Sequence, residues 1–584
     1  MNPAAEPTHL LSVLVWLPAI AGLFVMFLPR QQPGLLRAFG VGISLFEFGK
    51  SLQLLTGSDY ARGFRFVENA EWIPSLGIRY HLAVDGISLW LILLTTFLTP
   101  ITLYVAFGSV KVKQKEFIAS FLLLESFMIG AFLSLDMFLF YVFWELMLVP
   151  MYLIIGVFGG PNRVYAAVKF FLYTFVASLF MLLAILYMVA KYRALDPGHH
   201  FSFDYFDLMR LGFPRGTEIA LFIAFAVAFA VKVPMFPLHT WLPDAHTEAP
   251  TGGSMILAAV LLKMGTYGFM RFALPFFPAA SHMVGPTLAG LACAGIVYGA
   301  AVAWRQRDFK KLIAYSSVSH LGFVMLGISA RTPQALTGAV LQMVNHGIST
   351  GALFLLVGVI YDRRHTRDLA EFGGLAKVMP IYAAFFVFVT MSSVGLPLTN
   401  GFVGEFLIIT GSFSSDLLQI SYHCTTNLDG QRICDIAGMG PLYAGLAALG
   451  VLFGAIYMLD CVQKVFFGPN QNPKNKHLTD LTDREITALV PLALMIIAIG
   501  VKPMYFTSRI EPDVTAWLDA YKHKREQTTR PSATEAYLLP AEESTGAPGG
   551  GNAAPNAQPQ LVPPSPARGG GPIALVAPAA EGSR

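Results

Sequence analysis

The chain has 584 residues, of which 55% are hydrophobic and only 13% are charged, and its net charge is +4. Soluble domains carry about 25% charged residues, so this composition indicates a polytopic membrane protein and excludes a soluble enzyme or a small disulfide-rich scaffold. The small net charge gives no reason to expect a nucleic-acid partner.

Hydropathy predicts an all-α membrane protein with about fourteen transmembrane helices. Apolar stretches long enough to cross a bilayer fall at 10–28, 34–55, 85–107, 116–134, 136–158, 164–190, 218–239, 252–274, 285–304, 309–329, 334–360, 379–412, 440–467 and 485–505. An even number of spans places both termini on one side. Lys and Arg are more frequent in the loops on the side of the membrane opposite the termini, and loops rich in these residues face the cytoplasm. Both termini are therefore predicted on the outer side of the membrane.

The spans group into regions along the chain. Residues 1–110 hold three spans, 111–275 hold five, 285–470 hold another five, and 480–521 hold the last span and a short surface helix at 507–521. The outer loop at 62–84 partly alternates between apolar and polar residues, which predicts a short hairpin. Residues 522–584 are rich in Pro, Gly and Ala and are predicted to be a disordered tail.

Six predicted spans each carry an ionisable side chain near the middle. A charge at the centre of a membrane helix costs about 2.5–3.5 kcal/mol, so each such residue needs a reason. One of them alone could be a structural ion pair or a satisfied core residue. Six in series are instead typical of a path for a small cation, most simply the proton. These residues are Glu145, Lys232, Lys263, His320, His346 and Glu405.

Other charges near the spans have simpler explanations. Asp136 suits the start of a helix, where a carboxylate faces the positive end of the dipole. Glu47 and Lys50, three residues apart on one span, are predicted to pair with each other. Lys169 is expected to reach the membrane surface or form an ion pair. For Glu125, a structural and a functional role are equally favoured.

Two predicted spans are broken beside these charges. Proline removes a backbone donor, and non-helical backbone at membrane depth needs protein or a hydrated cavity to cover it. The residues that interrupt the seventh span are Pro234 and Pro237, and those that interrupt the twelfth are Pro397 and Gly401.

The breaks and charges recur along the chain. The interval from Glu145 to Lys232 is 87 residues and that from His320 to Glu405 is 85. Spans 4–8 and 9–13 are therefore predicted to be two internal repeats of five helices each. Because five is odd, the repeats are inverted relative to each other, which is a common layout of secondary transporters.

Cys424 and Cys434 lie in a predicted outer loop on either side of a turn-prone sequence, 427–430. In an oxidising compartment they could form a disulfide across a hairpin, and the alternative is two free thiols. The four cysteines of the chain contain no CxxC pair, so an iron–sulfur site is not predicted. No metal site is predicted either.

Four stretches of sequence resemble one family. The longest are 231–250, which reads VKVPMFPLHTWLPDAHTEAP, and 397–406, which reads PLTNGFVGEF; Trp144-Glu145 and 344–346 are the shorter two. Over residues 1–505 the chain closely resembles the M-type antiporter-like subunits of bacterial respiratory complex I, the proton-pumping NADH–quinone oxidoreductase. Glu405 matches the M type, because the related L and N subunits mostly carry lysine there.

The resemblance implies roles for the six residues. Glu145 and Lys232 would form a coupling ion pair, and Lys263 would be the central relay. His320 and His346 would bridge from Lys263 to Glu405, which would open toward the exit. In the segment between the seventh and eighth spans, helix capping and loop structure are the simpler interpretation of His239, Asp244, His246 and Glu248.

The resemblance also implies a place in a larger assembly. The chain would lie in the bacterial inner membrane, with both termini on the periplasmic side and with the antiporter-like subunits L and N as neighbours. It would hold no cofactor itself. NADH, FMN, iron–sulfur clusters and quinone would belong to other parts of the complex.

Two other classes of membrane protein share part of this pattern. A subunit of a multisubunit sodium/proton antiporter would have no link to NADH, and Glu405 argues against it. An electron carrier of the cytochrome b type would use paired histidines such as His320 and His346 as haem ligands. That alternative leaves the buried lysines and the broken helices unexplained.

Overall fold

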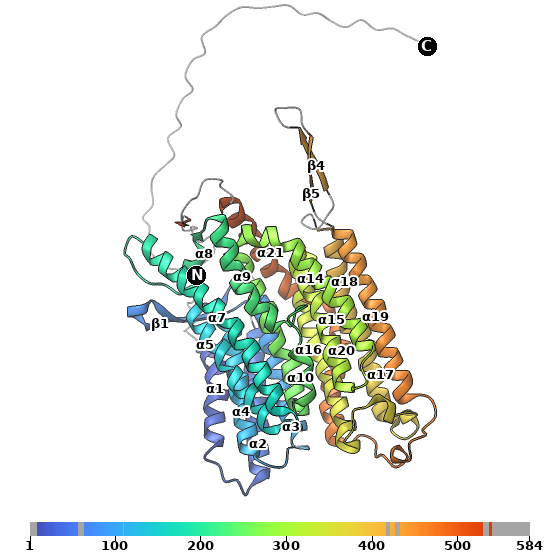
Figure 1. The fold of residues 1–584 in the computed structure, drawn as a ribbon. Helices are drawn as coiled ribbons and strands as arrows, with labels where there is room; N and C mark the ends of the chain where they lie inside the picture. The colour runs from blue at the N-terminus through green and yellow to red at the C-terminus, as the bar shows by residue number, and fades with distance from the viewer. Residues whose placement is uncertain are drawn as a thin grey trace, which may run out of the picture. The chain divides into compact units, whose positions relative to one another are not determined.

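The computed structural model describes residues 9–56, 63–108, 110–415, 421–426, 432–437, 439–528 and 536–539. The described chain is mostly helical, as predicted, and the helices stand side by side in a bundle (Figure 1). Ten helices of this described part are long and apolar enough to cross a membrane. Each of the apolar stretches predicted from hydropathy overlaps a helix of the structure.

The N-terminal part forms four long helices and a hairpin. Strands β1 and β2 pair antiparallel, which confirms the predicted hairpin at 62–84. Gly77 closes it with φ of +66°, and a Cβ there would lie 1.8 Å from the Phe201 carbonyl oxygen, so only glycine fits. The elements are α1 (Leu10–Val25), α2 (Pro33–Ser51), η1 (Leu52–Leu55), β1 (Arg65–Ile73), η2 (Pro74–Leu76), β2 (Ile78–Val84), α3 (Gly86–Ala106) and α4 (Gln114–Leu133).

The next part contains the first helix break. Asp136 caps the start of α5 by accepting hydrogen bonds from the backbone N–H groups of Phe138 and Leu139, which confirms its predicted structural role. The elements are α5 (Met137–Leu146), α6 (Leu148–Phe158), α7 (Arg163–Leu195), α8 (Tyr205–Met209), β3 (Leu211–Gly212), α9 (Arg215–Lys232), α10 (Leu242–Glu248), α11 (Thr251–Ile256), the π segment η3 (Leu257–Leu261), α12 (Leu262–Gly268), the π segment η4 (Phe269–Ala273) and α13 (Leu274–Phe276).

The C-terminal part contains the second break, between α17 and α18. Its elements are α14 (Pro278–Trp304), α15 (Phe309–Ala330), α16 (Pro333–Arg364), η5 (Leu369–Glu371), η6 (Leu375–Lys377), α17 (Pro380–Val394), α18 (Asn400–Phe413), β4 (Ser421–Thr426), β5 (Arg432–Ala437), α19 (Gly440–Phe466), η7 (Pro473–Asn475), α20 (Asp483–Val501), α21 (Pro503–Thr528) and β6 (Tyr537–Leu538).

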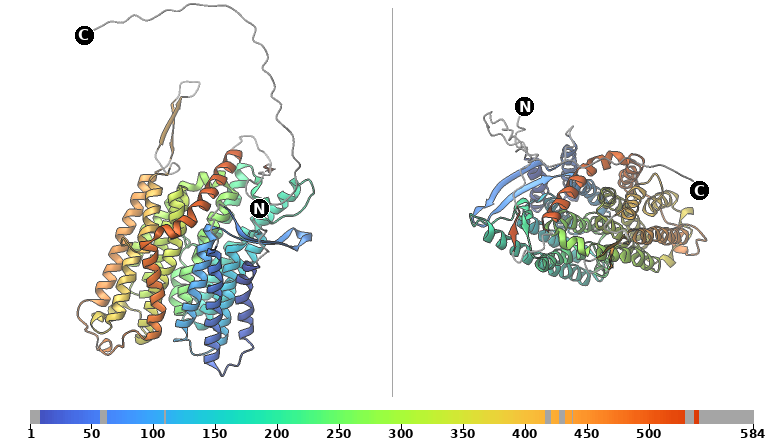
Figure 2. Two further views of the ribbon diagram at one scale, coloured as in Figure 1. Left: turned by 180° about the vertical axis from the view of Figure 1, so that it is seen from behind. Right: turned by 90° about the horizontal axis from the view of Figure 1, so that it is seen from above.

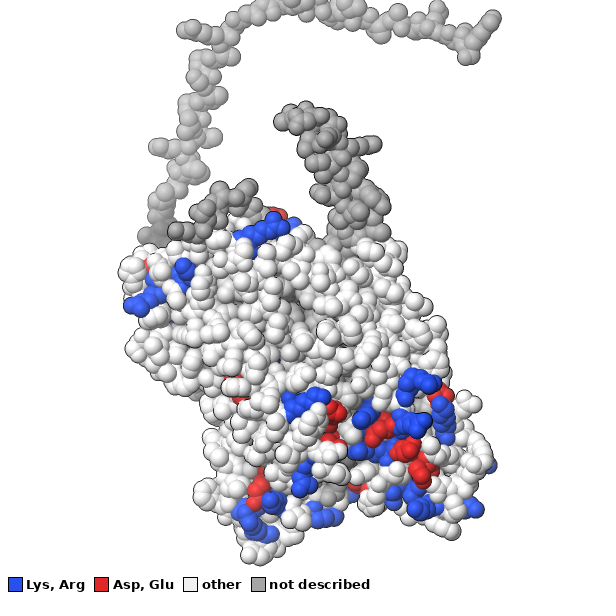
Figure 3. Space-filling model, viewed as in Figure 1, with Lys and Arg blue, Asp and Glu red and all other residues white. Residues whose placement is uncertain are grey.

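Two helical stretches lie at the centre of the bundle. The most apolar windows of Thr251–Phe276 and of α16 are entirely buried, whereas only a third of those of α19 and α20 is buried. The exposed side chains of α7 are largely apolar, as expected for a surface that contacts lipid. On the face seen in Figure 3 the middle is almost free of charge, and most of the Lys, Arg, Asp and Glu gather at the lower end.

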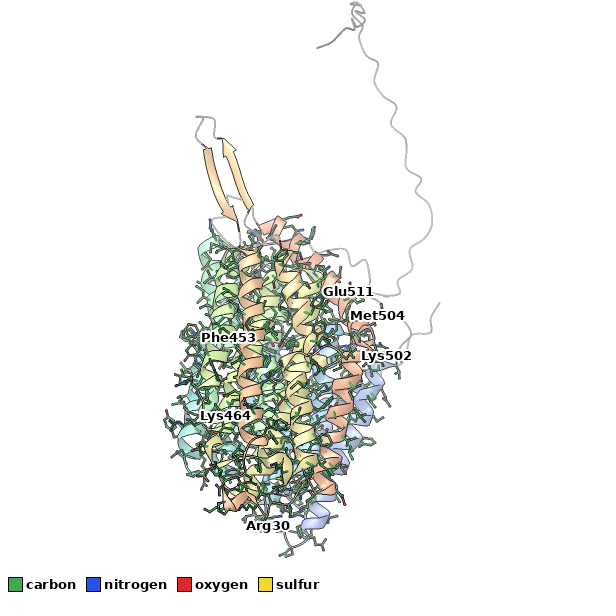
Figure 4. All side chains as sticks on the ribbon, turned by 90° about the vertical axis from the view of Figure 1, so that its right-hand side faces the viewer. Arg30, Phe453, Lys464, Lys502, Met504 and Glu511 are labelled. Carbon is green, nitrogen blue, oxygen red and sulfur yellow. The ribbon has the colours of Figure 1, made fainter. Side chains whose placement is uncertain are left out.

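Helix α21 runs across one end of the bundle (Figure 2). In Figure 4, Glu511 on α21 and Arg30, in the loop between α1 and α2, lie toward opposite ends. Asp513 fastens α21 by accepting hydrogen bonds from the backbone N–H groups of Gly63 (2.7 Å) and Gly86 (2.5 Å). The predicted surface helix at 507–521 is therefore too short, and its real counterpart is half-buried.

A short strand lies within the region predicted to be a disordered tail. Tyr537–Leu538 form β6, which pairs antiparallel with β3 so that Leu538 lies opposite Leu211. The Leu539 backbone N–H also donates to the Arg210 carbonyl at 2.7 Å. The prediction of disorder is therefore wrong for residues 522–528, which form the last turns of α21, and for residues 536–539. The remainder of 529–584 lies outside the described residues.

Strands β4 and β5 form a second hairpin between α18 and α19. Their antiparallel register places Cys424 opposite Cys434. The side chains of these two residues lie outside the described part of the chain, so the predicted disulfide stays a prediction.

A buried ion pair joins α3 to the central helices. Asp85 caps α3 by accepting hydrogen bonds from the backbone N–H groups of Ile87 and Ser88. Its other carboxylate oxygen accepts from Arg271 of η4 at 2.5 Å, and both side chains are buried. Arg271 also donates to the Tyr267 hydroxyl (3.3 Å). These contacts fix the end of α3 against the segment that carries Lys263.

Candidate functional site

Four of the six ionisable residues predicted from the sequence lie together inside the bundle. The Lys263 amino group is 2.6 Å from Nδ1 of His346, and Nδ1 of His320 is 2.9 Å from Oε1 of Glu405. The rings of His320 and His346 are 5.6 Å apart between centroids. All four side chains are buried. They form a continuous polar row from α12 through α16 and α15 to α18.

Two π-helical segments position Lys263. The residue lies on α12, a helix of only seven residues that η3 precedes and η4 follows. The Lys263 amino group also donates to the Ala258 carbonyl (2.5 Å), five residues earlier in the chain and within η3. Such π turns are rare and recur at functional sites. Hydropathy predicted one continuous span here, and no pattern in the sequence indicates the two wide turns.

The break between α17 and α18 presents Glu405. Pro397 lies within the break, as predicted, and Gly401 lies in the first turn of α18. A Cβ at Gly401 would come within 2.1 Å of the Ser392 carbonyl oxygen, so glycine allows the two half-helices to approach closely. Asn345 of α16 and Asn400 hold the break from the side, because each donates its side-chain amide to the other's backbone carbonyl, at 2.7 and 3.2 Å.

A polar cavity lies beside the two histidines. Its free volume is about 10 Å³, and polar side chains from α15, α16, α17 and α18 line it. A cavity of this kind can hold water, which needs two to four polar partners. Gln342, one of the lining residues, donates to the same carboxylate oxygen of Glu405 that faces His320 (3.0 Å). The lining residues are His320, Gln342, Asn345, His346, Ser349, Thr350, Ser392, Ser393 and Gly401.

The break between α9 and α10 presents Lys232. Lys232 is the last residue of α9, and Pro234 and Pro237 follow it in the break, as predicted. The Trp241 indole N–H donates to the Val231 carbonyl (2.9 Å) and so satisfies a backbone group near the end of the helix. The structure confirms that both predicted breaks lie directly beside a buried charge.

Lys232 itself is buried among aromatic rings. Its amino group has no hydrogen-bond partner among the described residues. It lies 5.3 Å from the ring centroid of Trp144 and 5.7 Å from that of Phe170. Aromatic faces attract a cation, but by less than a carboxylate does. The Lys232 amino group is therefore enclosed without a fixed anionic partner.

The ion pair expected between Glu145 and Lys232 is not formed in this structure. Glu145 on α5 is half-buried and accepts a hydrogen bond from the Ser178 hydroxyl of α7. The Trp144 ring, from the residue before Glu145, lies against the lysine instead. The structure therefore shows these two residues in a separated arrangement.

His246 is a buried histidine for which loop structure seemed the simpler interpretation. Its ring stacks on Phe354 of α16 at 4.6 Å, and neither ring nitrogen has a partner among the described residues. Ser254 links its backbone to Lys310 of α15, because the Ser254 hydroxyl donates to the His246 carbonyl (3.0 Å) and accepts from Lys310 (3.3 Å). His246 therefore lies in the interior beside the polar row, and only the family motif marked it in the sequence.

The other three residues singled out between the predicted seventh and eighth spans have structural contacts. Asp244 forms an ion pair with Lys169 of α7 at 2.7 Å, which is one of the two alternatives expected for Lys169. Glu248 accepts a hydrogen bond from the Asn162 backbone N–H (2.9 Å). His239 packs with its ring against Tyr298.

The pairing predicted between Glu47 and Lys50 is wrong. Glu47 is completely buried, and neither of its carboxylate oxygens has a hydrogen-bond partner among the described residues. Lys50 points elsewhere, because its amino group lies 5.9 Å from the ring centroid of Phe46, an exposed side chain.

Comparison with known proteins gives consistent matches. Residues 134–428 match the family described as NADH:quinone oxidoreductase/Mrp antiporter. NADH-quinone oxidoreductase subunit M of Rhodobacter capsulatus is 44% identical over 523 residues, which cover 88% of this chain and 97% of that protein. NADH-ubiquinone oxidoreductase chain 4 of Marchantia polymorpha is 41% identical over 508 residues, covering 86% and 96%.

Solved structures show the same fold. A chain of respiratory complex I from Thermus thermophilus with bound NADH matches with a TM-score of 0.76 at 31% identity, covering 88% of this chain and 99% of that one. A chain of the Mrp complex from Dietzia matches with a TM-score of 0.70 at 22% identity, covering 88% of this chain and 52% of that one. At that identity the second match concerns the fold alone.

Proposed function

Because this chain belongs to the family of membrane subunits shared by NADH:quinone oxidoreductase and the Mrp antiporters, we propose that it moves protons through the membrane arm of an NADH–quinone oxidoreductase. The observation that carries the proposal is the pair of contacts from Lys263 to His346 and from His320 to Glu405, on either side of the two neighbouring histidine rings, which are tilted by 54° to each other. Each of the four groups can bind and release a proton, and a polar cavity adjoins them.

Glu145 and Lys232 control the loading of this row in our proposal. When Glu145 approaches Lys232, the carboxylate holds the lysine in its charged form. In the separated arrangement of this structure, the enclosed Lys232 lacks that partner and passes its proton toward Lys263. Moving one proton through 100 mV requires about 2.3 kcal/mol, and electron transfer in other subunits supplies this energy.

The proposal extends to the architecture. We propose fourteen spans, with residues 111–275 and 285–470 as two inverted five-helix repeats between the segments 1–110 and 480–521. The paired breaks after α9 and after α17, each beside a buried charge, support this arrangement. The end of the bundle that carries Arg30 would face the cytoplasm of the bacterium, and both termini would lie on the periplasmic side.

The proposed partners follow from the same family. The neighbours would be other membrane subunits of the complex, namely the antiporter-like subunits L and N. NADH, FMN, the iron–sulfur clusters and quinone would belong to the rest of the complex, so this chain contributes proton transfer and no redox chemistry. A multisubunit sodium/proton antiporter is the alternative that the experiment below separates.

Proton uptake driven by NADH in inverted membrane vesicles tests this function. Glu145→Gln is expected to lower the rate of uptake about tenfold, and NADH oxidation is expected to fall with it, because neutral glutamine has no negative charge to hold Lys232 in its charged form. Glu511→Gln, at an exposed position on α21, is the control and should leave both rates unchanged. If Glu145→Gln spares both NADH-driven rates and abolishes sodium-driven proton exchange instead, the antiporter alternative is correct.

We also propose the disulfide between Cys424 and Cys434. The antiparallel register that places the two residues opposite each other supports it. Mass spectrometry of unreduced peptides is expected to find the two cysteines in one linked peptide when the protein is made in cells with an oxidising periplasm. Cys293 and Cys461, which are buried and unpaired, should be recovered as free thiols in the same sample. Two alkylated thiols at 424 and 434 would contradict the disulfide.

A further inference from the structure

Helix α2 buries one stripe of its surface against the neighbouring helices. The stripe begins with Gly40 and Ser44 and continues through Glu47 and Ser51, at the three- and four-residue spacing of one helix face. The Ser51 hydroxyl is 2.7 Å from that of Thr96 on α3, which fixes α3 against the end of the stripe. Glu47 therefore points into the protein, although the neighbouring Phe46 is exposed.

Contacts between α2 and α4 show which residue Glu47 faces. Arg37 of α2 donates to the Gln114 side chain of α4 (3.3 Å). One turn further, a Cβ at Gly40 would lie 2.9 Å from Ile118, so the two helices are in close contact and run in the same direction. Glu47 lies seven residues, or two turns, beyond Gly40 on α2, and Glu125 lies seven residues beyond Ile118 on α4. The register therefore places the two carboxyl groups at the same level of one interface.

Neither carboxyl group has a partner in the described part of the chain. Both side chains are completely buried, and none of their four oxygen atoms has a hydrogen-bond partner. The Thr99 hydroxyl, beside Glu125 on α3, donates to the Thr95 carbonyl (2.9 Å). Two acidic groups are thus held at one level of a buried interface, with no cationic side chain bonded to either of them among the described residues.

The cations on the surrounding helices lie elsewhere. Helices α1, α3 and α6 carry no charged residue. On α4, Lys115 and Glu116 lie in the first turn, about 15 Å along the axis from Glu125, and they contact the Met26 carbonyl and Arg30 respectively. On α2, Arg37 is a similar distance from Glu47, and Lys50 lies over Phe46.

The ionisable side chains of α5 and α12, two further helices that pack on α4, have partners of their own. Glu145 of α5 accepts a hydrogen bond from Ser178, and Lys263 of α12 contacts His346. Neither is bonded to the two carboxyl groups. The charge of Glu47 and Glu125 must therefore be cancelled locally.

We propose that Glu47 and Glu125 form a second proton-binding site, in which the two carboxyl groups hold at least one proton. This site is separate from the polar row that runs from Lys263 to Glu405. One ionised carboxylate at membrane depth costs about 2.5–3.5 kcal/mol, and a second beside it adds repulsion. A bound metal cation would need several further oxygen ligands, and the described residues contain no cluster of three or more His, Cys, Asp and Glu side chains able to hold one. A proton needs only the two carboxyl groups.

Labelling with dicyclohexylcarbodiimide tests the site in the intact complex in its native membrane. This apolar reagent attacks protonated carboxyl groups, and peptide mass spectrometry locates the adduct. At neutral pH we expect Glu47 or Glu125 to be labelled at least about tenfold more than Glu116, a half-buried glutamate of α4 that is ion-paired with Arg30. The yield should fall as the pH rises. No turnover is involved, so failure of the proposed pumping function would leave this result unaffected.

Single variants test whether the two groups act as a pair. In the native protein the yield is expected to fall in two steps with pH, because coupled acids titrate as a pair. In Glu47→Gln the label on Glu125 should fall in one step. Glutamine has the shape of a protonated glutamate, so this variant is expected to assemble normally. A native profile with one step at each glutamate, unchanged in Glu47→Gln, would overturn the pairing.

Two further results would overturn the proposal. If sodium chloride lowers the yield tenfold at constant pH and choline chloride does not, the site binds sodium. If neither residue is labelled, infrared spectra of the native protein and of Glu47→Gln/Glu125→Gln decide the matter. We expect the double variant to lose a protonated carboxyl band that the native protein shows. If it loses carboxylate bands alone, both groups are ionised in the native protein and the proposal is wrong.

Discussion

Lys263→Met is expected to lower NADH-driven proton uptake at least about a hundredfold, a loss of about 2.7 kcal/mol in the barrier to transfer. Methionine fills a similar volume but binds no proton, and the Lys263 amino group is the group of α12 that bonds to His346. The measurement is proton uptake by inverted vesicles, normalised to the amount of assembled complex. The subunit should remain in the membrane, because the change removes a buried charge.

The matched control for this variant is Lys464→Met. Lys464 lies on α19 (Figure 4), is exposed, and pairs with Asp460 one helical turn away at 2.6 Å. Exposed pairs of this kind contribute less than about 1 kcal/mol, so uptake should be unchanged. If Lys263→Met pumped at the native rate, protons would have to bypass the row of Lys263, His346, His320 and Glu405, and the proposed route would be wrong.

Asp85→Ala is expected to destabilise the subunit by about 3–5 kcal/mol, because it leaves the buried Arg271 without its anionic partner. The loss of the helix cap on α3 adds about 1 kcal/mol. The expected result is a complex that loses this subunit at a lower temperature, or that contains little of it. The measurement is the subunit content of the solubilised complex after heating.

A double variant separates the lost ion pair from the lost cap. In Asp85→Asn/Arg271→Met both charges are gone and the cap is kept, so the subunit should be more stable than in Asp85→Ala. Asp460→Ala removes an exposed partner and should have little effect. Equal losses in Asp85→Ala and in the double variant would show that the unpaired charge of Arg271 is not what destabilises Asp85→Ala.

Much of the fold could be predicted from the sequence because lipid imposes simple rules. Apolar length marked the helices, and the prolines after Lys232 and before Glu405 marked the two breaks. The high cost of a buried charge marked the six ionisable residues, four of which the structure brings together in the polar row. These signals are local in the sequence, so no knowledge of packing was needed.

Which partner each charge meets could not be predicted in this way. Three-residue spacing showed that Glu47 and Lys50 are neighbours on one helix, but not that the protein buries Glu47 and leaves Lys50 beside Phe46. Similarly, the motif indicated that Glu145 and Lys232 act together. It could not show that in this conformation Glu145 accepts a hydrogen bond from Ser178 while Lys232 lies against the Trp144 ring.

Changes of helical pitch and long-range pairing were also invisible in the sequence. The sequences of η3 (LAAVL) and η4 (FMRFA) contain no glycine or proline that would mark a change of pitch. Strand β6 forms because Tyr537 and Leu538 meet β3, more than three hundred residues earlier. The composition of residues 522–584, which is rich in Pro, Gly and Ala, predicted disorder for the region as a whole and gave no sign of the strand at Tyr537–Leu538.

The arrangement of α21 and β6 has a practical consequence for shortening the protein. A chain ending after Leu539 would keep every contact described above, including the hydrogen bond from Leu539 to Arg210. A chain ending near Lys502 would lose Asp513, which binds Gly63 and Gly86, and Trp517, whose indole donates to the Met270 carbonyl in η4. Stop codons can therefore be placed after 539 to obtain a minimal subunit, and affinity tags belong beyond that point.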